Sequence, residues 1–234
     1  MASGCDAAAQ VSQLVLLESD FSAMPSVVAE GRRVVNNIQR SASLFLAKNI
    51  FSFLMAVSSA FFMLNYPLEP AQISLISMFT IGIPGSFLAL QPNTEAIHGR
   101  FLSNVLIKAL PAGLTDFLVV GALVIFGRVF GVDEMDISTA CTMLLAIVGF
   151  MILYHISKPL NLLRWIVWIG SGVGLLVCSI YLGDIFGITH MSMECVMLFV
   201  VFAIVTEPVL RYSTMFIERM GAMVASRRRK RAAR

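Results

Sequence analysis

Long apolar segments alternate with short polar ones along most of the 234 residues of this chain. Each apolar segment is close to the ~20 residues that an α-helix needs to cross a lipid bilayer. The pattern therefore predicts an all-α membrane protein, built as a bundle of six transmembrane helices. The six expected spans lie at about 43–65, 72–90, 102–130, 138–156, 163–183 and 193–213.

The composition supports this interpretation. Hydrophobic residues make up 58% of the chain and charged residues only 13%, and the mean hydropathy is +0.83. Soluble domains usually carry about 25% charged residues, so we expect lipid to surround most of this chain. The four cysteines and three histidines are spaced unlike a zinc site or a disulfide framework, and we expect no resident metal. They are Cys5, Cys141, Cys178, Cys195, His98, His155 and His190.

Residues 1–42 form the one extended polar stretch ahead of the spans. The apolar run 14–17 predicts a short buried strand. Asp20 or Ser22 is a suitable N-cap for a following helix, and Pro25 is tolerated in its first turn. Apolar positions then recur at helical spacing, which predicts an amphipathic helix leading to the first span. These positions are Val27, Val28, Val34, Val35 and Ile38.

The distribution of charge predicts the orientation of the spans. If the N-terminus is cytosolic, nearly all Lys and Arg residues lie inside, and Arg128 alone lies outside. Only an even number of spans gives this asymmetry, so both termini are expected in the cytosol. The basic run 227–231 directly follows the last span. We expect it to contact anionic lipid and anchor the topology, and we expect no nucleic-acid partner.

The second span contains a proline flanked by glycines, in the sequence SMFTIGIPG at 77–85. Pro84 has no N–H, and its ring clashes with the carbonyl of Thr80. Gly82 and Gly85 would allow the helix to unwind there, exposing that carbonyl and the Thr80 hydroxyl to a cation. The alternative is an ordinary proline kink.

Asn49 and Ser52 lie three residues apart near the start of the first span, and they share a helix face. Both side chains offer neutral oxygen atoms. They are therefore candidates either for binding a cation or for hydrogen bonds between helices.

Two acidic residues lie inside predicted spans, Asp116 in the third and Glu207 in the sixth. A buried acid near a helix centre costs roughly 2.5–3.5 kcal/mol, so each needs a reason to be there. Both are candidates for a charge relay. Both are equally suited to pairing with bases such as Lys108 or Arg211.

Several of these segments together resemble the P-type cation-transporting ATPases. Residues 1–21 (MASGCDAAAQVSQLVLLESDF) resemble the segment after the magnesium-binding aspartate loop of that family. Residues 28–39 (VAEGRRVVNNIQ) resemble the stalk helix that leads into the fifth transmembrane helix. The 82–84 turn falls where the sixth helix is unwound. The resemblance covers nearly the whole chain and implies its C-terminal region, from the end of the phosphorylation domain through helices five to ten.

This resemblance implies three regions. Residues 1–42 would be a cytosolic strand–helix remnant of an α/β phosphorylation domain with its stalk helix. Residues 43–216 would be a six-helix transport domain, and 217–234 a basic cytosolic tail.

The resemblance also implies a cation-binding set. Asn49 and Thr80 match positions that coordinate calcium in the calcium-pump branch, and Ser77 stands where that branch often has Asn. Ser52 and Ile81 replace two acids of that pattern. Calcium takes 6–8 oxygen ligands, so Asn49, Ser52, Ser77 and Thr80 would need others from the fourth helix, and a single weaker site or another cation remains open.

The implied function is cation transport, with calcium as a candidate cation, driven by ATP and Mg²⁺ in the intact parent protein. The chain has no Asp-Lys-Thr-Gly motif and no nucleotide-binding loop, so we expect no catalytic residue and no bound cofactor in it. Its partners would be the cation, membrane lipid and the N-terminal half of the pump, in a bacterial plasma membrane. The alternatives are a stand-alone passive permease or assembly subunit, and a degenerate remnant.

Overall fold

A computed structural model of the chain describes residues 4–18, 20–62, 65–91, 93, 95–97, 99–158 and 160–232, with side chains as far as 221 and at 223. The chain divides into two compact units. One comprises Met1–Ile38 with Pro92–His98, and the other comprises Gln39–Gln91 with Gly99–Arg234. All regular elements within the described ranges are helical.

The first unit contains a short helix and the start of a long one. Helix α1 spans Asp6–Val11, and a 3-10 turn at Phe21–Ala23 leads into α2, Met24–Phe62. Asp20 caps this turn by accepting hydrogen bonds from the backbone N–H of Ser22 at 2.8 Å and from its hydroxyl at 2.6 Å. These bonds lower the pKa of Asp20 because they favour the charged carboxylate. Of the two predicted N-caps, Asp20 is the one in the structure, and it caps the 3-10 turn that leads into α2.

The predicted strand at 14–17 is wrong. The structure has no strand there, and the side chains of Leu14 and Leu17 are 52% and 83% exposed. A strand needs a neighbouring strand to pair with its N–H and C=O groups. No such neighbour exists among the described residues, so the apolar run cannot be buried in a sheet.

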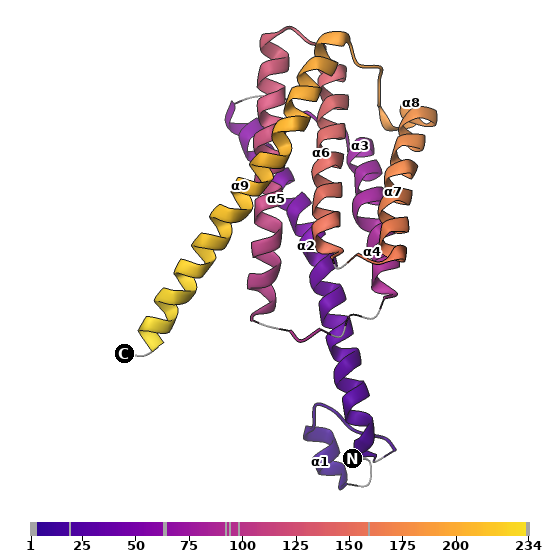
Figure 1. Ribbon diagram of the computed structural model, residues 1–234, viewed down its shortest axis with the longest axis vertical. Helices are drawn as coiled ribbons and strands as arrows, with labels where there is room; N and C mark the ends of the chain where they lie inside the picture. The colour runs from indigo at the N-terminus through magenta and orange to yellow at the C-terminus, as the bar shows by residue number, and fades with distance from the viewer. Residues whose placement is uncertain are drawn as a thin grey trace. The chain divides into compact units, whose positions relative to one another are not determined.

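The second unit is a helical bundle (Figure 1). The six predicted spans are confirmed. Six helical stretches are long and apolar enough to cross a membrane: Phe21–Phe62, Pro70–Ala89, Phe101–Val129, Glu134–Ile156, Leu162–Tyr181 and Met193–Gly221. Their elements after α2 are α3 (Pro70–Ser77), the turn η2 (Met78–Gly82), α4 (Ile83–Ala89), α5 (Phe101–Val129), α6 (Glu134–Ile156), α7 (Leu162–Tyr181), α8 (Gly183–Phe186) and α9 (Met193–Ala232).

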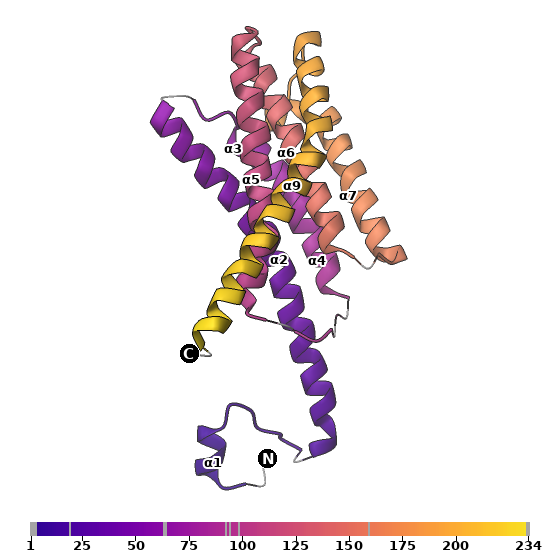
Figure 2. The ribbon, with the colours of Figure 1, turned by 60° about the vertical axis from the view of Figure 1, so that its left-hand side comes forward.

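Helices α5 and α6 form the centre of the bundle. The most apolar windows of these two helices are 56% and 61% buried, against 22% for α7 and 17% for α9. The peripheral helices therefore present most of their apolar surface outward, as expected where lipid replaces water. Figure 2, turned from the first view, again shows α9 crossing α5.

Small residues let the helices of the bundle approach closely. At Gly113 of α5, a Cβ atom would lie 2.7 Å from the side chain of Ile50 and 2.8 Å from the carbonyl of Ala47, both on α2. At Gly174 of α7, a Cβ atom would lie 2.5 Å from the ring of Phe79. Close packing of this kind contributes to the association of helices in a bilayer.

One end of the bundle is held together by Gln72, which is fully buried. Its amide oxygen accepts from the Ser138 hydroxyl at 2.8 Å and from the backbone N–H of Glu69 at 3.0 Å. Its amide nitrogen donates to the carbonyl of Gly187 at 2.9 Å. Gly187 has a φ of +65°, a conformation that favours glycine. This single side chain thus fixes α3 against α6 and against the residue that follows α8.

The opposite end is held by Arg164 at the start of α7, which is also buried. Its Nε donates to the side-chain oxygen of Gln91 at 2.6 Å, and its Nη1 donates to the carbonyl of Ser157 at 3.0 Å. Arginine suits this position because its planar fork donates to several acceptors at once. The ends of α4 and α6 are therefore tied to α7.

Candidate functional site

The second span contains a π-helical turn where unwinding was predicted. In η2 the N–H of Ile83 donates to the carbonyl of Met78, five residues back. Gly82 has φ −64° and ψ −64°, and Ile83 has φ −60° and ψ −54°, so the backbone stays helical. Pro84 cannot donate to the Thr80 carbonyl, and a wider turn accommodates its ring. The predicted unwinding at Gly82, Pro84 and Gly85 is corrected to a widened turn.

A small cavity lies beside this turn. It has a volume of about 30 Å³ and is lined by residues of α2, α3, η2, α5 and α6. Its polar lining comes from Lys48, Ser77, Thr80 and Asp116, and Gly149 also lines it. A cavity of this volume holds about one water-sized particle. Two of the four predicted cation-binding residues, Ser77 and Thr80, are therefore brought together.

Thr80 is 3% exposed and is fixed in place from two sides. Its hydroxyl donates to the carbonyl of Ile76 at 2.7 Å, so its remaining lone pairs are left to accept a hydrogen bond or bind a cation. Gly149 of α6 lies directly against it, since a Cβ atom there would be 2.8 Å from Thr80 Cγ2. Only glycine leaves room for Thr80 at this position.

Lys48 is a member of this site that sequence reasoning missed. Its Nζ donates to the hydroxyl of Ser77 at 2.5 Å, and that hydroxyl donates to the carbonyl of Ile73 at 2.6 Å. In the sequence, Lys48 contributes to the positive-inside count. The overlooked signal is its place a full turn inside the apolar stretch 43–65, where a lysine needs a functional reason.

Asp116 supplies the carboxyl group of the cavity. It is 5% exposed, and its Oδ1 has no hydrogen-bond partner in the described part of the chain. The salt bridges among the described residues are Arg33–Glu30 and Arg128–Glu134. The expected pairing of Asp116 with Lys108 is therefore not found. A buried carboxyl oxygen without a partner is costly, which makes it available to a ligand.

Asn49 and Ser52 do not line this cavity. Asn49 is exposed on α2, on the same surface as Phe45 and Phe53, which are 53% and 68% exposed. Ser52 is half-buried, and Tyr66 lies beside it. The structure thus separates the predicted set of four into two pairs. The role of all four in cation binding stays a prediction.

Glu207 lies apart from Asp116. It is exposed on α9 and lines a different groove, together with Lys108 and Arg211. No salt bridge joins it to Arg211 within the part of the chain that the structure describes. The two acids therefore do not form one relay in this conformation.

The chemistry of the cavity suits a hard cation. Hydroxyl and carboxyl oxygens are donors that alkali and alkaline-earth cations prefer, whereas transition metals favour nitrogen and sulfur. Among the described residues there is no group of three or more His, Cys, Asp and Glu side chains placed to hold a metal ion. The side-chain oxygen atoms that line the cavity belong to Ser77, Thr80 and Asp116.

The fold and this site define an integral, multi-pass helical membrane protein with a polar cavity inside its bundle. No family model matches the chain. Comparison with known proteins shows that it is homologous to part of the P-type cation-transporting ATPases, and it belongs to that family as a segment.

The relatives share a similar degree of identity with the chain. The probable cation-transporting ATPase exp7 of Streptococcus pneumoniae is 36% identical over 189 residues, 77% of this chain and 24% of that protein. The calcium-transporting ATPase CtpE of Mycolicibacterium smegmatis is 36% identical over 173 residues, 68% of this chain and 22% of that protein. CtpE of Mycobacterium bovis is 34% identical over 193 residues, 76% of this chain and 24% of that protein. The chain thus spans about a quarter of the length of these relatives.

Proposed function

We propose that the chain is the C-terminal transmembrane part of an ATP-driven P-type cation pump, and that the transported cation passes through the cavity beside Thr80. The observation that carries this proposal is the polar cavity itself. It places the unpartnered carboxyl oxygen of Asp116 with the hydroxyls of Ser77 and Thr80, next to a π-helical turn. Such turns are rare and occur often at functional sites. The homology to cation-transporting ATPases supplies the reaction class.

The cavity lacks enough donors to enclose a calcium ion by itself. Calcium takes 6–8 oxygen ligands, and two hydroxyls with one carboxylate offer fewer. Asn49 faces outward beside Phe45 and Phe53, on a surface suited to cover by other helices. We propose that the missing half of the pump packs there, so that the fourth helix adds ligands and Asn49 becomes enclosed.

Lys48 sets the charge of this site. An ammonium and a carboxyl line the same small cavity, so the positive charge of Lys48 offsets that of an ionised Asp116. An entering cation must therefore compete with Lys48 for the Ser77 hydroxyl and for the carboxylate. This arrangement favours one weakly held cation over two. Calcium is the first cation to test, because two of the relatives are named calcium-transporting ATPases.

Helix α2 provides the mechanical link. It is a single helix of 39 residues, from Met24 to Phe62, and carries both the stalk-like sequence and Lys48. In the proposed pump, both termini are cytosolic, and residues 1–42 transmit changes of the phosphorylation domain to the cavity through this helix. ATP and Mg²⁺ act in the missing half. The membrane is a bacterial plasma membrane, and the basic tail contacts its anionic lipid.

The test is phosphoenzyme formation in an intact pump that contains this segment. Formation should depend on one cation when calcium, magnesium, manganese, potassium and sodium are compared. Asp116→Asn and Thr80→Ala should each raise the half-saturating concentration of that cation about tenfold or more. Ser74→Ala is the matched control, because Ser74 is exposed on α3 and its hydroxyl donates to the Pro70 carbonyl of the same helix. Unchanged cation dependence in both cavity variants would disprove the site assignment.

A further inference from the structure

A second, larger groove lies at the end of the bundle where α5 begins and α6 ends. Its volume is about 640 Å³, and α9 forms its third wall. Helix α9 crosses α5 and α6 at an angle instead of running alongside them (Figures 1 and 2). None of the polar residues that line the cation cavity lines this groove, although α5 and α6 contribute residues to both. The proposed transport function does not require the groove.

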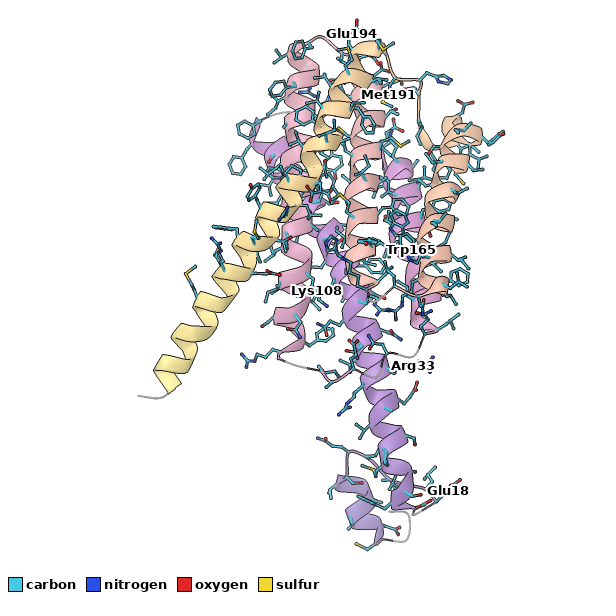
Figure 3. The ribbon with its side chains drawn as sticks, viewed as in Figure 1. Glu18, Arg33, Lys108, Trp165, Met191 and Glu194 are labelled. Carbon is cyan, nitrogen blue, oxygen red and sulfur yellow. The ribbon has the colours of Figure 1, made fainter. Side chains whose placement is uncertain are left out.

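The groove combines charged and apolar walls. Lys108, Lys158 and Arg211 contribute three positive charges, and Glu207 and Glu218 contribute two negative ones. The Lys, Arg and Glu side chains of the lining therefore leave an excess of one positive charge. Figure 3 labels Lys108 on α5, and its side chain is exposed. Apolar side chains complete the walls, among them Ile107, Met151, Ile156, Leu210 and Met215.

The basic groups of this groove are available to a ligand. Within the described residues, the salt bridges are Arg33–Glu30 and Arg128–Glu134, so neither Lys108 nor Arg211 has a carboxylate partner. Both side chains are exposed. Lys158 sits over the ring of Tyr154, with 4.7 Å from its Nζ to the ring centre.

The depth of these groups corresponds to a membrane interface. Lys108 lies seven residues after the first residue of α5, which is about 10 Å along a helix axis. Lys158 follows the last turn of α6. Long basic side chains at this depth extend their charges to the polar boundary of the bilayer while their stems stay in hydrocarbon.

We propose that this groove binds an anionic glycerophospholipid. Lys108 and Arg211 receive its phosphodiester, and the acyl chains lie along Ile107, Leu210 and Met215. Basic pockets between transmembrane helices are known to suit anionic headgroups, and each basic residue near the surface contributes attraction. A soluble phosphate would leave the apolar walls uncovered, whereas a phospholipid fills both parts of the groove. The excess positive charge favours an anionic headgroup over a zwitterionic one.

The experiment is native mass spectrometry of the full 234-residue chain in detergent, titrated with phosphatidylglycerol or with phosphatidylcholine of the same acyl chains. Phosphatidylglycerol should bind at least about tenfold more tightly. The double variant Lys108→Gln/Arg211→Gln should weaken its binding roughly tenfold or more. Arg100→Gln/Arg219→Gln is the matched control, since it removes the same charge from exposed positions outside the groove and should change affinity less than about threefold.

For a further variant we expect lipid affinity to change in the opposite direction. Glu207→Gln removes a repelling carboxylate and should tighten phosphatidylglycerol binding, which a folding defect would not do. Equal affinities for the two lipids would overturn the proposal, as would equal losses in the groove and control double variants. Displacement of the lipid by glycerophosphoglycerol, the headgroup without acyl chains, at similar concentration would show a soluble phosphate site and would also overturn it.

Discussion

Gly149 of α6 lies against Thr80 of the π-helical turn, so closely that a Cβ atom on Gly149 would be 2.8 Å from Thr80 Cγ2 and 3.1 Å from its Cβ. The two residues come from different spans and meet at the wall of the polar cavity. Threonine is stiff about its first side-chain bond, so it cannot move aside easily. The absence of a side chain at 149 therefore fixes where the Thr80 hydroxyl lies.

We expect Gly149→Ala to push Thr80 out of position. The overpacking should cost about 1–3 kcal/mol of stability and raise the half-saturating cation concentration of an intact pump. Thermal unfolding in detergent and cation-dependent phosphorylation would measure the two effects. Gly121→Ala on α5 is the control, because a Cβ atom there meets nothing within 4 Å. Equal behaviour of the two variants would show that the contact does not constrain Thr80.

Replacement of Lys48 should affect cation binding in the direction opposite to Asp116→Asn. In Lys48→Met, the ammonium no longer occupies the Ser77 hydroxyl or offsets the carboxylate. We expect the half-saturating cation concentration of an intact pump to fall about tenfold, which corresponds to about 1.4 kcal/mol. Cation titration of phosphoenzyme formation would measure this shift. An increase would instead show that Lys48 supports the cation site.

Loss of the Gln72 hydrogen bonds should destabilise the bundle, although the substitution leaves the net charge of the chain unchanged. Gln72→Leu keeps the volume approximately and leaves the Glu69 N–H and the Gly187 carbonyl without their partner. We expect a cost of about 2–4 kcal/mol and a fall of at least about 5 °C in the unfolding midpoint in detergent. Ser74→Ala on the same helix should shift the midpoint by less than about 2 °C. A Gln72→Leu variant that matches this control would remove Gln72 as an anchor.

The proposed topology can be tested by cysteine labelling in membrane vesicles. Cys5 and an introduced Ile97→Cys should react with an impermeant maleimide from the same side, and Phe130→Cys should react only from the other. All three positions are exposed, with Ile97 at 38% and Phe130 at 65%. The buried Cys141 and Cys195 should stay unlabelled. Labelling of Cys5 and position 97 from opposite sides would contradict the positive-inside assignment.

Periodicity and composition were enough to place the spans. Each expected apolar segment corresponds to a helical stretch, and the N-cap at Asp20 follows from local chemistry alone. These features depend on neighbouring residues in the chain, because hydrogen bonds of a helix and its caps are local. The prediction of a strand at 14–17 was wrong because a strand, unlike a helix, needs a pairing partner from a distant part of the chain.

The composition of the cavity was decided only by tertiary packing. The sequence indicated Ser77 and Thr80 but placed Asn49 beside them, and it gave no reason to join Lys48, Asp116 and Gly149. The position of a residue on a helix fixes the face on which it lies, whereas the neighbour of that face depends on how four separate spans pack. The π-helical turn adds one residue to its turn and rotates the faces that follow it by about 100°. The sequence therefore determined which segments cross the bilayer, and packing determined which of their polar atoms meet.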